Sequence, residues 1–142
     1  NNIVKDWSNY SSYGDKSSLI KKLHNESDLI GKILKTIIDK AIYTGEAYII
    51  DGVQLLPEYL PLADINYFAL CLLDESLHKK RFLEPNITKH RHLNNAGYDV
   101  VILYQEEICS SARRFGLPVY DTSVDPDQLA KHIIEDHQFK PV

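Results

Sequence analysis

Asp51 is the residue of this chain whose position could carry chemistry most directly. It closes the apolar run Ala47–Ile50 and is followed at once by Gly52. This pattern predicts a short buried strand and then a sharp turn. Ligands of open α/β sheets bind just beyond the carboxyl ends of strands. A carboxylate there could hold Mg²⁺ or accept the proton of an attacking hydroxyl. An ordinary Asp-Gly turn explains the same pattern equally well.

A second group of candidate residues is basic and flanks a polar segment. Arg81 and Arg91 are the two arginines of this group, and Lys79, Lys80 and Lys89 accompany them. Phosphoryl transfer requires positive charge near the migrating group. A segment that closes over a nucleotide as a lid would bring these guanidinium groups onto its phosphates. The alternative is a solvated basic helix face.

Three further polar positions could contact a substrate or a cofactor. Gln54 lies three residues after Asp51 and could donate a hydrogen bond to an acceptor substrate. A side-chain amide that hydrogen-bonds to backbone groups of the loop explains this position equally well. Arg114 lies at the end of a predicted helix, where it complements the helix dipole and could reach a phosphate. Asp121 ends a predicted strand, and a turn that caps the final helix is the favoured interpretation for it.

The elements that position these residues alternate between helix and strand. Ser27 is predicted to cap an amphipathic helix that ends at Gly45, after an opening segment to about Asn25 that is mostly loop. Alternation of this kind predicts an α/β layer fold. The other expected elements, in chain order, are a strand ending at Asp51, a strand over Asn66–Leu73, a helix over Glu75–Phe82 behind Asp74, a helix over Tyr98–Phe115, a strand over Leu117–Asp121 and a helix from Asp125 onward.

Composition sets the general class of the protein. The chain has 142 residues, of which 44% are hydrophobic and 25% charged, as in one globular domain. Its net charge of -4 gives no drive toward nucleic acid or anionic membranes. No signal peptide or membrane-spanning run is present, so a cytoplasmic location and buried free thiols at Cys71 and Cys109 are expected. Because the chain has no methionine and begins at Asn1, a trimmed or partial chain is expected.

The order of these elements resembles the latter part of a P-loop small-molecule kinase, most closely the 2-phosphoglycerate kinase family. In that family a glutamate stands at the position of Asp51, so the carboxylate is preserved here. A histidine stands at the position of Gln54, which leaves the phosphoryl acceptor open. Four segments carry the resemblance: Ser11-Ser12-Tyr13, Ile49–Pro57, Asp74–Phe82 with His78 and Arg81, and Ala112–Val119.

One motif of such kinases does not occur in these 142 residues, namely Gly-x-x-x-x-Gly-Lys-Ser/Thr. That loop holds the nucleotide phosphates and places a hydroxyl on magnesium. The resemblance therefore implies a parallel-sheet, three-layer nucleotide-kinase-like fold whose first strand and phosphate loop lie upstream or on another chain. The missing strand would lie between the strands ending at Asp51 and Leu73. Another segment should occupy that place, or the two strands should pair directly.

The resemblance also implies an activity and a division of the chain. It implies transfer of a phosphoryl group from ATP, with Mg²⁺, to a small anionic hydroxylated metabolite. The alternatives are a degenerate kinase-like binding or assembly module, and a nucleotide or nucleoside kinase. Residues 1–142 would be the carboxyl-terminal part of one domain, with segments 1–26 (acceptor side), 27–74 (Asp51), 75–97 (lid) and 98–142 (closing elements). The implied site residues are Asp51, Arg81 and Arg91 for catalysis, Asp51 for the metal, Lys80, Arg114 and Asp121 for the nucleotide, and Ser11, Ser12, Tyr13 and Gln54 for the substrate.

Overall fold

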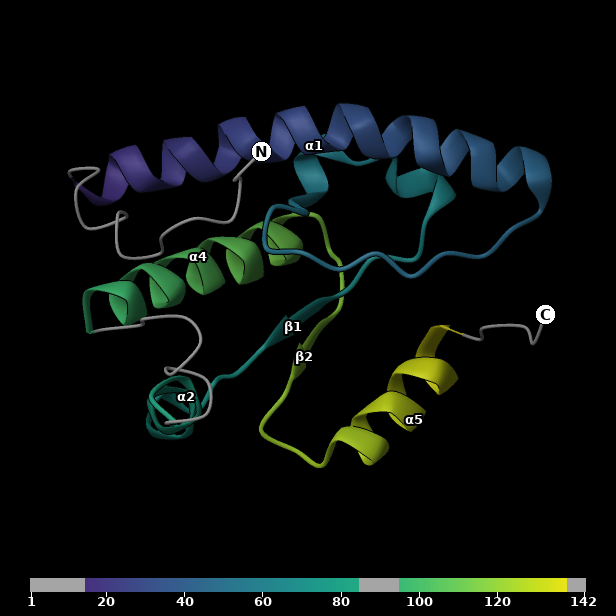
Figure 1. Ribbon diagram of the computed structural model, residues 1–142. Helices are drawn as coiled ribbons and strands as arrows, with labels where there is room; N and C mark the ends of the chain where they lie inside the picture. Colours follow the sequence, from purple (N-terminus) through teal and green to yellow (C-terminus); the bar gives the residue numbers. More distant parts are fainter. Residues whose placement is uncertain (1–14, 85–94, 138–142) are drawn as a thin grey trace.

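The computed structural model describes residues 15–84 and 95–137. Its centre is a parallel pair of short strands, β1 (Ala69–Cys71) and β2 (Val119–Asp121). Helix α4 (Asn95–Arg114) covers one face of this pair, and the long helix α1 (Lys16–Thr44) lies along α4 on the side away from the strands (Figure 1). Helix α5 (Pro126–His137) packs on the opposite face, where the Tyr120 hydroxyl donates to Asp136 at 2.7 Å. The mixed α/β class is thereby confirmed and is compatible with a kinase-like fold.

Three shorter helices complete the described elements. The 3₁₀ turns η2 (Pro57–Tyr59) and η3 (Leu62–Asp64) lie between α1 and β1, and α2 (Glu75–Phe82) follows β1. Asp74 caps α2 as predicted, since its carboxylate accepts from the backbone N–H of Leu77 at 2.9 Å. None of the helices in the described ranges has the length and apolar character needed to cross a membrane.

Helix α1 begins eleven residues before the predicted cap. Asp15 caps it, accepting a hydrogen bond from the Ser18 backbone at 2.9 Å. The prediction for Ser27 was wrong, because its buried hydroxyl donates to the Leu23 carbonyl one turn back and is satisfied inside the helix. The predicted end is confirmed, with Gly45 at φ 70. The buried positions recur every three or four residues: Leu19, Leu23, Ser27, Gly31, Leu34 and Ile38.

The predicted strand ending at Asp51 does not form. Residues 46–52 are irregular and exposed, and the Ile49 side chain is 100% exposed. A strand needs hydrogen-bonding neighbours and a packed face, and this segment has neither among the described residues. The strand over Asn66–Leu73 is also shorter than predicted. It pairs with β2, in register Leu70 with Tyr120, and not with the segment before Asp51.

Helix α4 joins the two parts of the core. It packs on Leu19 and Leu23 of α1 through Val100 and Tyr104, and on β1 through Cys109 and Ala112. The expectation of free thiols was wrong, because Cys71 and Cys109 form a disulfide between β1 and α4. Both are buried, and their 38-residue separation left no local signal of the pairing. Phe115, the last residue of the predicted helix, is 46% exposed because α4 ends at Arg114.

Gln105 pairs with the backbone of Leu72, the residue that follows β1. Its side-chain carbonyl accepts from the Leu72 backbone N–H at 2.9 Å, and its amide group donates to the Leu72 carbonyl at 3.1 Å. These are the two hydrogen bonds that a neighbouring strand would make, so one glutamine supplies them from α4. The partly buried side chain of Gln105 therefore has a structural role at the edge of the sheet.

Candidate functional site

The carboxyl ends of β1 and β2 gather part of the predicted site. Asp121 is the last residue of β2, and its carboxylate accepts from the backbone N–H of Leu73, just beyond β1, at 3.3 Å. Arg81 of α2 reaches the turn after β2, where its guanidinium donates to the Thr122 carbonyl at 3.0 Å. Lys80, next to Arg81, is exposed. The edge expected to bind ligands thus carries the Asp121 carboxylate, with the Asp74 carboxylate near it, and the Arg81 guanidinium.

Asp121 is already engaged by its own turn. Its carboxylate accepts from the Ser123 hydroxyl at 2.7 Å and from the Ser123 backbone at 3.0 Å. These two hydrogen bonds lower the pKa of Asp121 below its ordinary value. The carboxylate does not cap the final helix, as the favoured interpretation had it, because Asp125 accepts from the first turn of α5. Asp121 therefore acts as a fixed anion that joins the ends of the two strands.

Asp51 and Gln54 lie away from these contacts. Asp51 is exposed on the irregular segment after α1, and Gln54 is partly buried in the turn that follows. Within the described ranges, no hydrogen bond or ion pair joins Asp51 to Arg81 or to any other basic side chain. Asp51 is separate from them because the predicted strand that would have brought it to the edge of the sheet does not form.

Four predicted site residues lie outside the described ranges. They are the three residues of the acceptor segment and the second arginine of the lid: Ser11, Ser12, Tyr13 and Arg91.

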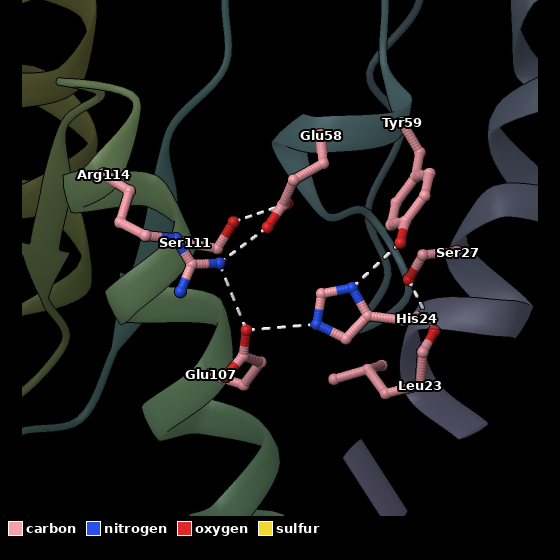
Figure 2. Close-up of polar contacts among 8 residues, drawn as sticks. All are labelled: Leu23, His24, Ser27, Glu58, Tyr59, Glu107, Ser111 and Arg114. Atoms are coloured by element: carbon pink, nitrogen blue, oxygen red, sulfur yellow. Dashed lines mark hydrogen bonds and ion pairs between the residues drawn. The ribbon is translucent and has the colours of Figure 1, made fainter. Parts of the chain in front are cut away.

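Arg114 lies in a different environment from the one predicted. Figure 2 shows its guanidinium between two carboxylates, Glu58 of η2 at 2.7 Å and Glu107 of α4 at 3.3 Å. His24 of α1 completes the group, with its Nε2 3.1 Å from Glu107 and its Nδ1 3.0 Å from the Tyr59 hydroxyl. We call His24, Glu58, Tyr59, Glu107, Ser111 and Arg114 the α1–α4 polar cluster.

Glu58 is the most strongly held carboxylate of this cluster. Burial alone would raise its pKa, but hydrogen bonds from the Ser111 hydroxyl, at 2.5 Å, and from Arg114 bring the pKa below its ordinary value. Ser111 itself is fully buried. The cluster therefore holds the Glu58 carboxylate in its ionised form at neutral pH, in a partly desolvated place between η2 and α4.

Sequence reasoning missed this cluster, apart from Arg114. His24 and Glu107 are 83 positions apart, and Glu58 lies between the strands predicted to end at Asp51 and to begin at Asn66, where no helix or strand was expected. The one local signal was a polar position on the inner face of each helix, at Ser27 in α1 and at Ser111 in α4. Three side chains of the cluster could ligate a cation, because the ligand atoms of His24, Glu58 and Glu107 all lie within 4.8 Å of one another.

Comparison with known proteins gives one informative likeness. No protein-family model matches the sequence, and no solved structure is significantly similar to it. The chain is 25% identical over 105 residues to a protein named 2-phosphoglycerate kinase from Methanocaldococcus jannaschii. The matched region is 69% of this chain and 33% of that protein, so it spans about a third of the relative's length. The likeness suggests a kinase-like relationship.

Proposed function

We propose that this chain is part of an ATP- and Mg²⁺-dependent phosphotransferase that acts on a small, anionic, hydroxylated metabolite of the 2-phosphoglycerate type. The observation that carries the proposal is the match to a protein named 2-phosphoglycerate kinase. The parallel pair β1–β2, with a carboxylate and an arginine at its carboxyl end, is compatible with it. The proposal includes a P-loop type of phosphate site, although the loop is not among these residues.

The partner in this proposal is the polypeptide that carries the phosphate loop. Such a loop supplies backbone amides and a lysine to the nucleotide phosphates. We propose that it comes from an upstream segment or from another chain and that it completes the sheet beside β1. Leu70 of β1 is 52% exposed and Val53 is 38% exposed, and both line one cavity of about 160 Å³ with Val101 and Ile108 of α4. An apolar strand of that polypeptide would cover these side chains.

Roles for individual residues follow from this assembly as proposals. Arg81 contacts the turn after β2, and it would neutralise phosphate charge there together with Lys80, its neighbour in α2. Asp51 would reach Mg²⁺ or the acceptor hydroxyl once its segment pairs as a strand. Arg114 suits a nucleotide less well, because two carboxylates hold its guanidinium. The remaining proposed positions are Arg91 for catalysis, Asp121 for the nucleotide, and Ser11, Ser12, Tyr13 and Gln54 for the acceptor.

The test is a transfer assay on a protein that contains these residues together with a phosphate loop. ATP labelled at the γ-phosphate is incubated with Mg²⁺ and 2-phosphoglycerate, and the labelled product is separated. We expect turnover in that protein and none in the 142-residue chain alone. Asp51→Asn should lower kcat by about a hundredfold or more. Asp39→Asn is the matched control, because Asp39 is an exposed carboxylate of α1 that pairs with Lys35.

Two outcomes would replace the proposal. If ATP binds but no acceptor is phosphorylated, the chain belongs to a degenerate binding or assembly module. If nucleosides or nucleotides accept the phosphate and 2-phosphoglycerate does not, it belongs to a nucleotide or nucleoside kinase. Full turnover by Asp51→Asn would leave the class of reaction intact and remove the role proposed for that carboxylate.

A further inference from the structure

The α1–α4 polar cluster contains the donor set of a transition-metal site. His24 offers an imidazole nitrogen, and Glu58 and Glu107 each offer a carboxylate oxygen. Three protein ligands with a fourth position for water are the usual number for an accessible zinc site. In a tetrahedral site with bonds of about 2.0–2.2 Å, neighbouring ligand atoms lie about 3.3 Å apart. His24 Nε2 and Glu107 Oε1 are 3.1 Å apart, so this pair is already at the required spacing.

Two of the three candidate ligands, His24 and Glu58, are each oriented by a neighbouring side chain that contacts an atom other than the one facing the cluster. The Tyr59 hydroxyl, 3.0 Å from His24 Nδ1, can accept a hydrogen bond from that nitrogen as well as donate one to it. When Nδ1 donates to Tyr59, the Nε2 lone pair faces Glu107. Ser111 donates to one oxygen of Glu58 and leaves the other oxygen toward the cluster. Outer partners of this kind orient the ligands of metal sites.

Charge and access favour a divalent cation over the present arrangement. Two carboxylates share the single guanidinium of Arg114, and a divalent cation between them would carry one positive charge more than that guanidinium. The ligand side chains are partly buried, at 26%, 22% and 19% exposure for His24, Glu58 and Glu107. The Arg114 side chain is 52% exposed and can swing into solvent. A divalent ion would then lie between both carboxylates and bind the His24 imidazole as well. Among the described residues, Arg114 contacts the two carboxylates and not the imidazole.

The geometry points to a Zn²⁺ site formed by His24, Glu58 and Glu107, in which Arg114 is the competing cation. Imidazole with two carboxylates suits Zn²⁺, whereas Mg²⁺ prefers oxygen ligands and keeps several waters. The site joins α1, η2 and α4 and would clamp them together. It does not depend on the proposed phosphotransferase activity.

The test is titration of the metal-free 142-residue chain with ZnCl₂ at pH 7.5, followed by calorimetry and by thermal unfolding. We expect one Zn²⁺ per chain and a higher Tm, with no comparable effect of MgCl₂. His24→Gln and Glu107→Gln should each weaken binding by more than about a hundredfold. Tyr59→Phe, which removes only an outer partner, should weaken it by about tenfold. Arg114→Gln should tighten it, because the competing cation is gone.

The matched control is His132→Gln in α5. His132 is 3.5 Å from the carboxylate of Asp136 in an exposed histidine–carboxylate contact, and it lies outside the cluster. Its loss should leave Zn²⁺ binding unchanged. Variants that unfold are recognised by circular dichroism, and Arg114→Gln keeps the proposal falsifiable, because that side chain is exposed. Binding that survives His24→Gln, or that appears only in Arg114→Gln, would overturn the site and leave Arg114 as the permanent cation of the cluster.

Discussion

Gly31 is the point at which α1 meets the 3₁₀ turn η2, and the structure predicts that Gly31→Ala destabilises the protein. A Cβ added at Gly31 would lie 2.3 Å from the Tyr59 carbonyl oxygen and 3.1 Å from the carbonyl carbon and Cβ of Tyr59. Ordinary contact begins at 3.4 Å, so the backbone of η2 would have to retreat from α1 by about 1 Å. That retreat would also move Glu58 and Tyr59 away from Ser111 and His24.

The magnitude follows from two opposing effects. Overpacking costs about 1–3 kcal/mol, and the upper value applies because the obstructing atoms are backbone and cannot rotate away. Alanine gains about 1 kcal/mol over glycine inside a helix. The net loss is about 2 kcal/mol. At about 4 °C per kcal/mol for a domain of this size, the Tm should fall by about 8 °C.

The assay is thermal and urea unfolding followed by circular dichroism, with amide exchange read at residues 58–60. Gly52→Ala is the matched control, since the nearest neighbours of a Cβ there, in the side chains of Gln54 and Leu55, would be 3.7 Å away. It should leave stability unchanged or raise it by up to about 1 kcal/mol. If Gly31→Ala proved as stable as Gly52→Ala, the close approach of η2 to α1 would be wrong.

Three other perturbations test the contacts that hold the fold. Gln105→Leu removes both hydrogen bonds to Leu72 and should cost about 2 kcal/mol with faster amide exchange at Leu72; unchanged exchange would contradict the edge-pairing role. Glu58 has a pKa below its ordinary value of 4.5, so its contribution to stability is present above that value and is lost as the pH falls through the lower pKa of the folded state. Urea unfolding between about pH 5 and pH 3 should show this loss, and Glu58→Gln should flatten it. Cys71→Ser opens a bridge that spans 38 residues and should cost about 4 kcal/mol, as should a reductant; a loss below about 1 kcal/mol would mean that Cys71 and Cys109 are not joined in solution.

The parts of the fold that the sequence predicted are those with local signals. Asp74 and Gly45 are a cap and a stop whose chemistry acts within one helical turn, and both were placed correctly. Ser27 has the residue type of a cap but lies on the inner face of α1, where tertiary packing keeps it buried. The true start at Asp15 lies in a polar stretch whose helical face is visible only once Leu19 and Leu23 are known to meet α4.

For the candidate site residues, too, some positions could be predicted from the sequence and others depend on tertiary packing. The carboxyl ends of parallel strands meet by topology, so Arg81 and Asp121 could be expected near one another. The α1–α4 polar cluster depends on how α1 crosses α4 and on where η2 sits, and neither is encoded in local spacing. Arg114 was predicted to reach a phosphate from its charge and its place at the end of a helix, whereas its position between Glu58 and Glu107 follows from tertiary packing.

We propose one physical origin for the failure of the strand before Asp51 to form and for the exposure of Leu70 in β1. Ile49 is 100% exposed and Leu70 is 52% exposed, although strands usually bury such side chains. In the sheet that we propose, a strand of the phosphate-loop polypeptide would lie between their segments, cover both, and bring Asp51 to the edge that already holds Asp121. Amide exchange at residues 48–50 should therefore slow in a protein that transfers phosphate, and it should stay fast in the 142-residue chain. Fast exchange in an active protein would separate the activity from Asp51, because an unpaired segment cannot hold that carboxylate in place.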